Sequence, residues 1–276
     1  MNLHVTKGNG EKALFDPGKL KQALQSSGAG KYEQERIVEE VRKELYEGIS
    51  TRKIYQLAFG LLKKESHKMA GRYRLKNAIM ELGPTGFPFE TFVGKVFETQ
   101  GYEVQTGVIV KGRCVQHEVD VIARKGKEML MVECKFHTDN LTKSGVQVPL
   151  YIHSRFLDVK AAWEKQYGTD LEYRGGVVTN TRFSEDAMSY GSCAGLMMVS
   201  WDYPFGDGLK HLIDQSGLHP LTSLISLTKA QKQQLLDKRI VLCSELVNAQ
   251  DLLREMRLSE KQINRILREA SNLISR

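Results

Sequence analysis

The chain has 276 residues, of which 41% are hydrophobic, enough apolar material for more than one core. Its formal net charge of +7 favours a polyanionic partner such as nucleic acid. The four cysteines are widely spaced and form no Cys-x-x-Cys pair, which argues against a zinc site or a disulfide framework and indicates free thiols in a reducing compartment.

The segment Met1–Lys7 lacks the apolar stretch of a signal peptide. No apolar run approaches the ~20 residues that a membrane span requires. We therefore expect a soluble cytoplasmic protein with no membrane partner.

Residues 3–15 predict a small hairpin that turns at Gly8-Asn9-Gly10, and Asp16-Pro17 is typical of an N-cap followed by a first-turn proline. Helical stretches follow over residues 20–24, 33–46 and 51–64. Over about residues 3–80 this order resembles the ATP-cone, a regulatory nucleotide-binding module. The matching motifs are Val5-x-Lys7-x-x-Gly10, Phe15-Asp16, Lys19-Leu20, Ser50-Thr51-x-x-Ile54 and Ala70-x-Arg72-Tyr73.

The ATP-cone resemblance implies ATP or dATP as an effector, with Lys7 and Lys19 as phosphate contacts. The family usually carries Lys-Arg before the hairpin turn, whereas this chain has Lys7-Gly8. Two alternatives stay open. Both lysines could be ordinary solvated surface residues, and the module could instead provide a DNA-binding or dimerising surface.

The breaker cluster Gly83–Pro88 separates this module from the central segment. Further on, two short apolar runs flank a turn at residues 124–127, and they carry Asp120 on the first run and Glu133-Cys134-Lys135 on the second. A turn centred between residues 125 and 126 places Asp120 opposite Met131. Because side chains alternate with period two, Glu118, Asp120, Met131, Glu133 and Lys135 are expected on one face.

This set of residues suits phosphodiester hydrolysis. Mg²⁺ prefers carboxylate oxygens and takes only one or two of them, which leaves room for water and a substrate phosphate. Asp120 and Glu133 could share such an ion, and Lys135 could orient the attacking water. The alternative is an exposed hairpin with an ordinary salt bridge, but the apolar run Met129–Val132 indicates a strand buried on both sides, where a Glu and a Lys are costly unless used.

The arrangement of these residues resembles the PD-(D/E)xK nuclease superfamily, most closely its Mrr-like restriction endonuclease branch. The resemblance covers about residues 84–205, from the helix and strand of 86–104 through the hairpin to the Val-Thr-Asn strand and helix of 176–187. It implies a mixed α/β sheet, Mg²⁺ or Mn²⁺ as cofactor and Glu90 as a further acidic active-site residue. An acidic residue near a helix start also favours the helix dipole, which is a second explanation for Glu90.

The resemblance also suggests the Cys134 carbonyl as a third metal ligand. The segment Gln147–Tyr151 fits a Gln-x-x-x-Tyr element of some relatives, although Pro149 is unfavourable inside a helix. His117 and Glu118 are more simply interpreted as surface residues and are not included in the predicted site.

Helical periodicity returns after residue 206, with Thr228 as an expected N-cap and a break near Leu258-Ser259. The region loosely resembles DNA-holding helical hairpins but lacks their glycines. Its basic residues could contact phosphates or simply form the solvated face of a bundle, namely Arg254, Arg257, Lys261, Arg265 and Arg268.

The sequence thus predicts an ATP-cone-like domain over 1–82, an α/β nuclease-like domain over 84–205 and a helical domain over 206–276. The predicted function is metal-dependent cleavage of DNA, with RNA not excluded, and a homodimer is expected if one site per chain must cut two strands. The alternative is a nucleotide-sensing, nucleic-acid-binding protein with an inactive nuclease-like core. The positive charge lies in the flanking domains, since the central segment is slightly acidic.

Overall fold

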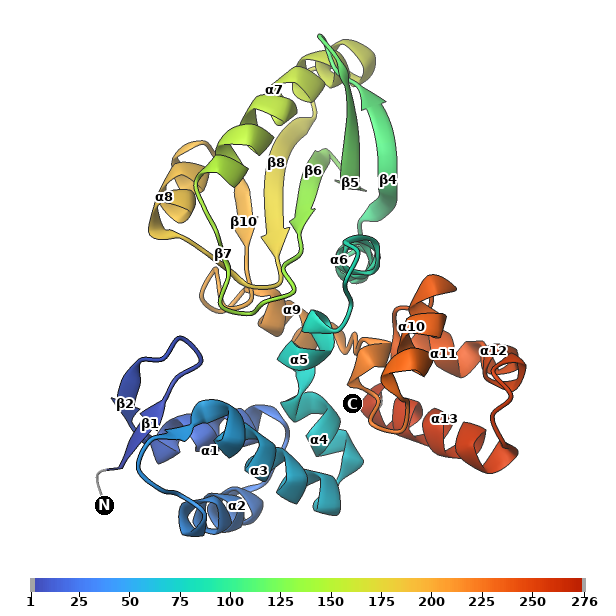
Figure 1. Ribbon diagram of the computed structural model, residues 1–276. Helices are drawn as coiled ribbons and strands as arrows, with labels where there is room; N and C mark the ends of the chain where they lie inside the picture. Colours follow the sequence, from blue (N-terminus) through green and yellow to red (C-terminus); the bar gives the residue numbers. More distant parts are fainter. Residues whose placement is uncertain (1–2, 275–276) are drawn as a thin grey trace.

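The computed structural model describes residues 3–274. A sheet with flanking helices is formed by the middle of the chain, and the N-terminal and C-terminal helices lie on two sides beneath it (Figure 1). The predicted fold class, a mixed α/β sheet with a mainly helical N-terminal part and a helical C-terminal part, is confirmed. The domain boundaries stay a prediction.

The N-terminal part begins with the predicted hairpin and capped helix. Asp16 accepts a hydrogen bond from the Gly18 amide at 2.8 Å, and Pro17 lies in the first turn. An additional strand of two residues, too short to be recognised by periodicity, pairs in parallel with the first strand. The elements are β1 (His4–Thr6), β2 (Lys12–Leu14), α1 (Pro17–Ser26), α2 (Lys31–Lys43), β3 (Ile49–Ser50), α3 (Thr51–Glu65), α4 (His67–Tyr73) and α5 (Leu75–Met80).

The central sheet has the strand order β10-β8-β6-β5-β4. Strands β10, β8 and β6 run parallel, whereas β6, β5 and β4 are antiparallel neighbours. The two-stranded sheet of β7 and β9 lies beside it. The elements are α6 (Phe87–Thr99), β4 (Glu103–Lys111), β5 (Gln116–Lys125), β6 (Glu128–Lys135), β7 (Lys143–Ser144), α7 (Gln147–Tyr167), β8 (Glu172–Thr179), β9 (Arg182–Phe183), α8 (Glu185–Cys193) and β10 (Met197–Val199).

The register of the β5–β6 hairpin differs from the predicted one. Lys125 pairs with Glu128, so the turn consists of residues 126 and 127, and Gly126 has a φ of +57°, a conformation that favours glycine. The predicted opposition of Asp120 and Met131 is wrong, because Met131 pairs with Ile122. The predicted alternation of faces also breaks at Asp120, because Val119 packs with Met131 and α7 whereas Val121 packs in the core that contains α6.

Helices cover both faces of the sheet. Helix α6 packs on one face, and α7 and α8 pack on the other, where Phe156, Val159 and Trp163 of α7 contact Met129 and Met131. Residues 129–132 are at most 7% exposed. The prediction that β6 is buried on both sides is therefore confirmed.

The C-terminal helices share a continuous apolar core with α5 and α6. Thr228 caps α10 through the predicted N-cap hydrogen bond. No helix between residues 3 and 274 combines the length and apolarity that crossing a membrane requires. The elements are α9 (Leu209–Ser216), the 3₁₀ turn η1 (Leu221–Ser223), α10 (Lys229–Asp237), α11 (Cys243–Asn248), α12 (Gln250–Glu255) and α13 (Glu260–Ile274).

Buried hydrogen bonds connect the C-terminal helices to α5. The Thr222 hydroxyl donates to the Ala78 carbonyl at 2.6 Å. The Lys232 ammonium, which is 6% exposed as a residue, donates to Glu81 at 3.0 Å and to the Thr222 carbonyl at 2.7 Å. Because a buried ammonium is costly without partners, this contact fixes α10 against α5.

The first prediction concerns Glu269, a buried carboxylate of α13 that accepts the amides of Ile225 and Ser226 at 2.6 and 3.0 Å. Glu269→Ala should lower the free energy of unfolding by about 2 kcal/mol or more, because two amides lose their acceptor. Urea denaturation measures the change. Glu260→Ala, an exposed carboxylate on the same helix, should change it by less than about 0.5 kcal/mol; equal losses in the two variants would contradict this role.

Candidate active site

Asp120 lies at an interruption of the strand pairing. The ladder between β4 and β5 has no pair at Gly107 and Asp120, and Gly107 has a φ of +62°. The ladder between β5 and β6 ends at the pair of Val121 and Val132. Just beyond it, Oδ2 of Asp120 accepts a hydrogen bond from the Cys134 amide at 2.7 Å. The side chain thus replaces a missing strand contact, which fixes the carboxylate beside residues 133–135.

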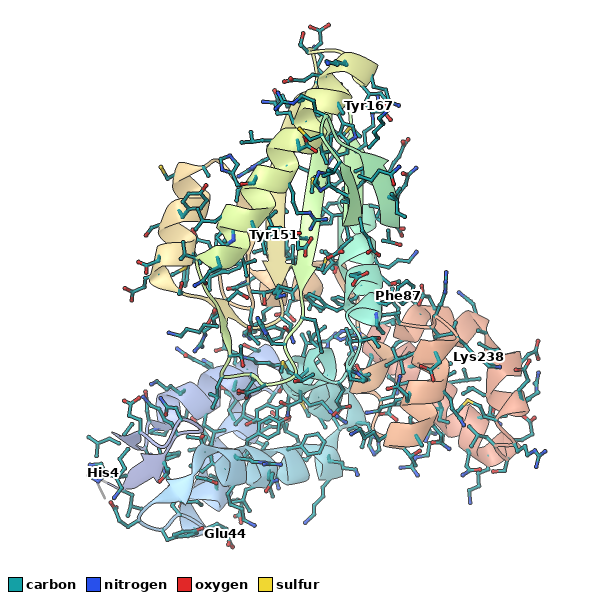
Figure 2. All side chains as sticks on the ribbon, turned by 45° about the horizontal axis from the view of Figure 1, so that its top comes forward. His4, Glu44, Phe87, Tyr151, Tyr167 and Lys238 are labelled. Atoms are coloured by element: carbon teal, nitrogen blue, oxygen red, sulfur yellow. The ribbon has the colours of Figure 1, made fainter. Side chains whose placement is uncertain are left out.

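Glu133 is held by helix α7. Its Oε2 lies 2.8 Å from Nη1 of Arg155, and both side chains are largely buried. The same guanidinium donates to the Glu118 carbonyl, and it stacks 5.3 Å from the ring centre of Tyr151. Figure 2 shows Tyr151 on α7, the helix that also carries Arg155. Arg155 therefore joins α7 to both strands of the hairpin.

Glu90 lies in the first turn of α6, half-buried. Burial, with smaller contributions from the charges of Asp120, Glu118 and Glu133, raises the pKa of Glu90 to about 7. Burial also raises the pKa of Asp120, and burial together with the charge of Asp120 raises the pKa of Glu133. The charge of Asp120 thus opposes the ionisation of both Glu90 and Glu133, so the three carboxyl groups lie near one another.

Lys135 ends β6 and is exposed. The expectation that Lys135 would be buried at a cost in free energy is wrong, because only the preceding residues 129–132 of β6 are enclosed on both faces. Residues at the end of β8 nevertheless hold the backbone at the end of β6 by hydrogen bonds. The buried Thr179 hydroxyl donates to the Lys135 carbonyl at 2.7 Å, and the buried Asn180 amide binds both the amide and the carbonyl of His137 at 2.8 Å.

The structure thus brings the four predicted residues, Glu90, Asp120, Glu133 and Lys135, into one region. Sequence reasoning missed Arg155. A signal existed in the helical spacing Gln147-x-x-x-Tyr151-x-x-x-Arg155, which places all three side chains on one face of α7. The objection from Pro149 was wrong, because it lies in the first turn of α7, where a missing backbone donor costs little. Glu118, left out of the prediction, also acts electrostatically on this site.

The carboxylates fit a divalent cation by their chemistry. Within residues 3–274, no group of three or more His, Cys, Asp or Glu side chains is arranged to hold a metal ion. A pair suffices for Mg²⁺, which completes its shell with water and substrate oxygens. The charge of Asp120 opposes the ionisation of Glu133; a cation would relieve this repulsion, and Arg155 relieves it in part.

The two lysines predicted to contact phosphates lie together in the N-terminal part. Lys7 and Lys19 both line a pocket of about 220 Å³, here called the cone pocket. Aromatic and aliphatic side chains form most of its wall. Lys7 forms an exposed ion pair with Glu11 at 3.0 Å. The remaining lining residues include Val5, Ala13, Phe15, Leu20, Ile54, Tyr55 and Tyr73.

Three family models match consecutive stretches of the chain. The ATP cone domain matches residues 3–77, a model described as restriction endonuclease matches residues 84–155, and the C-terminal model of AF1548-like proteins matches residues 219–274. These matches confirm the resemblance to an Mrr-like nuclease with an N-terminal ATP-cone. The central part of the chain thus has a restriction-endonuclease-like domain.

Two matches cover nearly the whole length of the matched protein. An uncharacterized protein of Archaeoglobus fulgidus is 34% identical over 183 residues, which are 66% of this chain and 99% of the relative. A crystal structure of a protein of unknown function, AF1548, is 34% identical with a TM-score of 0.56, and it covers 69% of this chain and 98% of its own. The chain belongs to the AF1548-like family.

A structure of MspJI restriction endonuclease in complex with a 27-mer oligonucleotide is also similar. It is 12% identical, with a TM-score of 0.33, over 62% of this chain and 35% of that one. A score this low adds nothing to the assignment.

The second prediction uses the raised pKa of Glu90. The folded protein retains a proton near pH 7 that the unfolded chain loses near its ordinary value of 4.5. The free energy of unfolding of the metal-free protein should therefore fall as the pH rises through this window, and Glu90→Gln should make the fall smaller. Urea denaturation in a chelator at several pH values measures this. Glu98→Gln, exposed on the same helix, should keep the wild-type slope, and an unchanged slope in Glu90→Gln would refute the placement.

Proposed function

We propose that the protein is a divalent-metal-dependent DNA endonuclease that hydrolyses phosphodiester bonds. The observation that supports this most directly is the meeting of Glu90, Asp120 and Glu133, which come from three different elements and all have raised pKa values. Lys135 and Arg155 supply positive charge at the same place. Perturbed carboxylates beside cations are typical of catalytic sites.

Asp120 and Glu133 would hold Mg²⁺ or Mn²⁺, with the Cys134 carbonyl as the third ligand that the family suggests. Such an ion, when bound, polarises the scissile phosphate and acidifies a water molecule. The hydrogen bond from the Cys134 amide keeps Oδ2 of Asp120 in place, and Arg155 holds Oε2 of Glu133, so both carboxylates are oriented before substrate arrives.

Lys135 would orient the attacking water or stabilise the charge that develops on the phosphate, because its ammonium is exposed at the strand end. The Thr179 and Asn180 contacts hold the backbone at that lysine and two residues after it. Glu90 would accept a proton from the attacking water. A carboxyl group with a pKa of about 7 can exchange protons at neutral pH.

The third prediction tests this chemistry. Purified protein with Mg²⁺ or Mn²⁺ should nick or cut plasmid DNA, and Glu133→Gln or Lys135→Ala should each reduce the rate by about a hundredfold or more. Glu103→Gln and Lys127→Ala, exposed residues of β4 and the hairpin turn, should keep wild-type rates. Cleavage activity that persists in both Glu133→Gln and Lys135→Ala would contradict the proposed active site.

The substrate class can be separated in the same assay. The metal chemistry is identical for DNA and RNA, so duplex DNA and RNA are compared side by side. Cleavage of both DNA strands by one site per chain favours a homodimer. If neither nucleic acid is cut, the alternative gains support, namely a nucleic-acid-binding protein whose nuclease-like core is a scaffold.

A second function, nucleotide sensing, is favoured by the cone pocket. Its apolar and aromatic walls suit a base and sugar, and Lys7 and Lys19 would meet the phosphates of ATP or dATP. Because both modules lie in one chain, the bound nucleotide would regulate the nuclease.

The fourth prediction concerns Lys19. Lys19→Ala should weaken ATP and dATP binding by about tenfold, because one charge-assisted contact to phosphate is lost. Isothermal titration calorimetry measures the dissociation constants. Lys21→Ala, an exposed lysine of the same helix outside the pocket, is the control. Failure of the wild-type protein to bind either nucleotide would leave the module without this function.

A further inference from the structure

Two larger clefts adjoin the cone pocket and reach the nuclease-like part. One, of about 800 Å³, shares Thr51 and Tyr55 with the cone pocket and extends to Asn140 and Arg182; it is called here the interdomain cleft. The other, of about 350 Å³, shares Lys7 with the cone pocket and is called here the hairpin cleft. The three hollows therefore lie next to one another between α1 and the loop after β6.

The size of the cone pocket argues that it holds only part of a nucleotide. Small-molecule sites usually enclose about 300–1,000 Å³. The cone pocket has about 220 Å³, so the rest of a ligand must extend into the adjoining clefts. We expect the ligand to extend past Lys7, since this lysine lines both the cone pocket and the hairpin cleft.

Cations outnumber carboxylates in the adjoining clefts, where Glu81 and Asp139 line the interdomain cleft and Glu11 lines the hairpin cleft. Arg52 and Lys76 line the interdomain cleft, Lys143 lines the hairpin cleft, and Arg182 lines both. Across residues 3–274, no carboxylate lies within ion-pairing distance of Arg52, Lys76 or Lys143. Arg182 pairs with Asp202 at 3.0 Å. Positive charge without carboxylate partners on the wall of a cleft suits an anion.

The strands β7 and β9 add an independent observation. Lys143 and Arg182 are direct neighbours in their parallel pairing, and both line the hairpin cleft. Like charges opposite each other destabilise a strand pair. Asp202 offsets the charge of Arg182 and Glu11 offsets that of Lys7, so an anion placed here would gain chiefly from Lys143.

We infer that the protein has a composite polyphosphate site in which the N-terminal module holds the nucleoside and the nuclease-like part, through Lys143 and Arg182, holds the terminal phosphates. The inference rests on the proposed nucleotide binding and deepens it. The ligand class is a nucleoside triphosphate, because a monophosphate bound in the cone pocket would end near Lys7.

The composite site also connects nucleotide binding to the candidate active site. Residues 138–142 lie in the loop that leaves β6 only a few positions after Lys135. Residues 138–141 line the interdomain cleft, and residues 140–142 line the hairpin cleft. Leu141 lies against the β1–β2 hairpin, since a Cβ atom on Gly8 would be 3.7 Å from its Cδ2. A bound triphosphate would therefore bridge the hairpin and this loop, and so restrain the chain segment next to the candidate active site.

The test compares ATP with AMP by isothermal titration calorimetry on the full chain. Lys143→Ala should weaken ATP binding by about tenfold or more and leave AMP binding unchanged within about twofold. Lys143→Arg should restore ATP binding, because the charge returns. Lys165→Ala, which removes an exposed lysine near the far end of α7, is the matched control and should bind both ligands like the wild type.

Hydrogen exchange supplies a second readout. ATP, but not AMP, should slow exchange of the amides of residues 138–142 in the wild type and not in Lys143→Ala. Equal ATP affinity in wild type and Lys143→Ala would overturn the composite site, as would equal affinities for ATP and AMP in the wild type. Loss of DNA affinity with unchanged ATP affinity would assign these cations to a nucleic acid backbone instead. Absence of ATP binding overturns the inference without touching the DNA cleavage assay, which needs no nucleotide.

Discussion

Three carboxylates share a half-buried space where β5 and β6 part, and like charges in such surroundings resist ionising together. The surrounding elements are arranged around this constraint. The Cys134 amide holds Asp120, and Arg155 of α7 holds Glu133. A sheet maintained only for its stability would gain by replacing these groups with apolar ones, which supports the chemistry proposed for this site.

Charge is distributed unevenly between the centre and its surroundings. The central segment is slightly acidic, whereas the cations that could meet a polyanion lie in the flanking parts and along the clefts between them. A phosphate chain or a nucleic acid backbone would therefore be gripped by several parts at once. Related modules usually carry an arginine where this chain has Gly8, and here Lys143 and Arg182 lie across the cleft from the hairpin that carries it.

The sequence was sufficient for features that depend on local periodicity. The proximity of Asp120 to residues 133–135 was predictable because the hairpin register was wrong by only two positions, whereas the break in alternation at Asp120 was not. Arg155 was not identified, since its distance from Glu133 depends on how α7 crosses the sheet. The strands β3, β7 and β9 have two residues each, too few for a periodic signal. The contact between Gly8 and Leu141 arises only when two distant parts of the chain are folded together.

The continuous core beneath the sheet has a practical consequence. Thr222 and Lys232 seal α5 against the C-terminal helices, and apolar residues of α6 belong to the same interior. A fragment cut out at residues 84–205 would present that interior to water, where exposed apolar surface promotes aggregation. The nuclease-like part is therefore best produced with its C-terminal helices attached, and its solubility without them would report how much of its interior they supply.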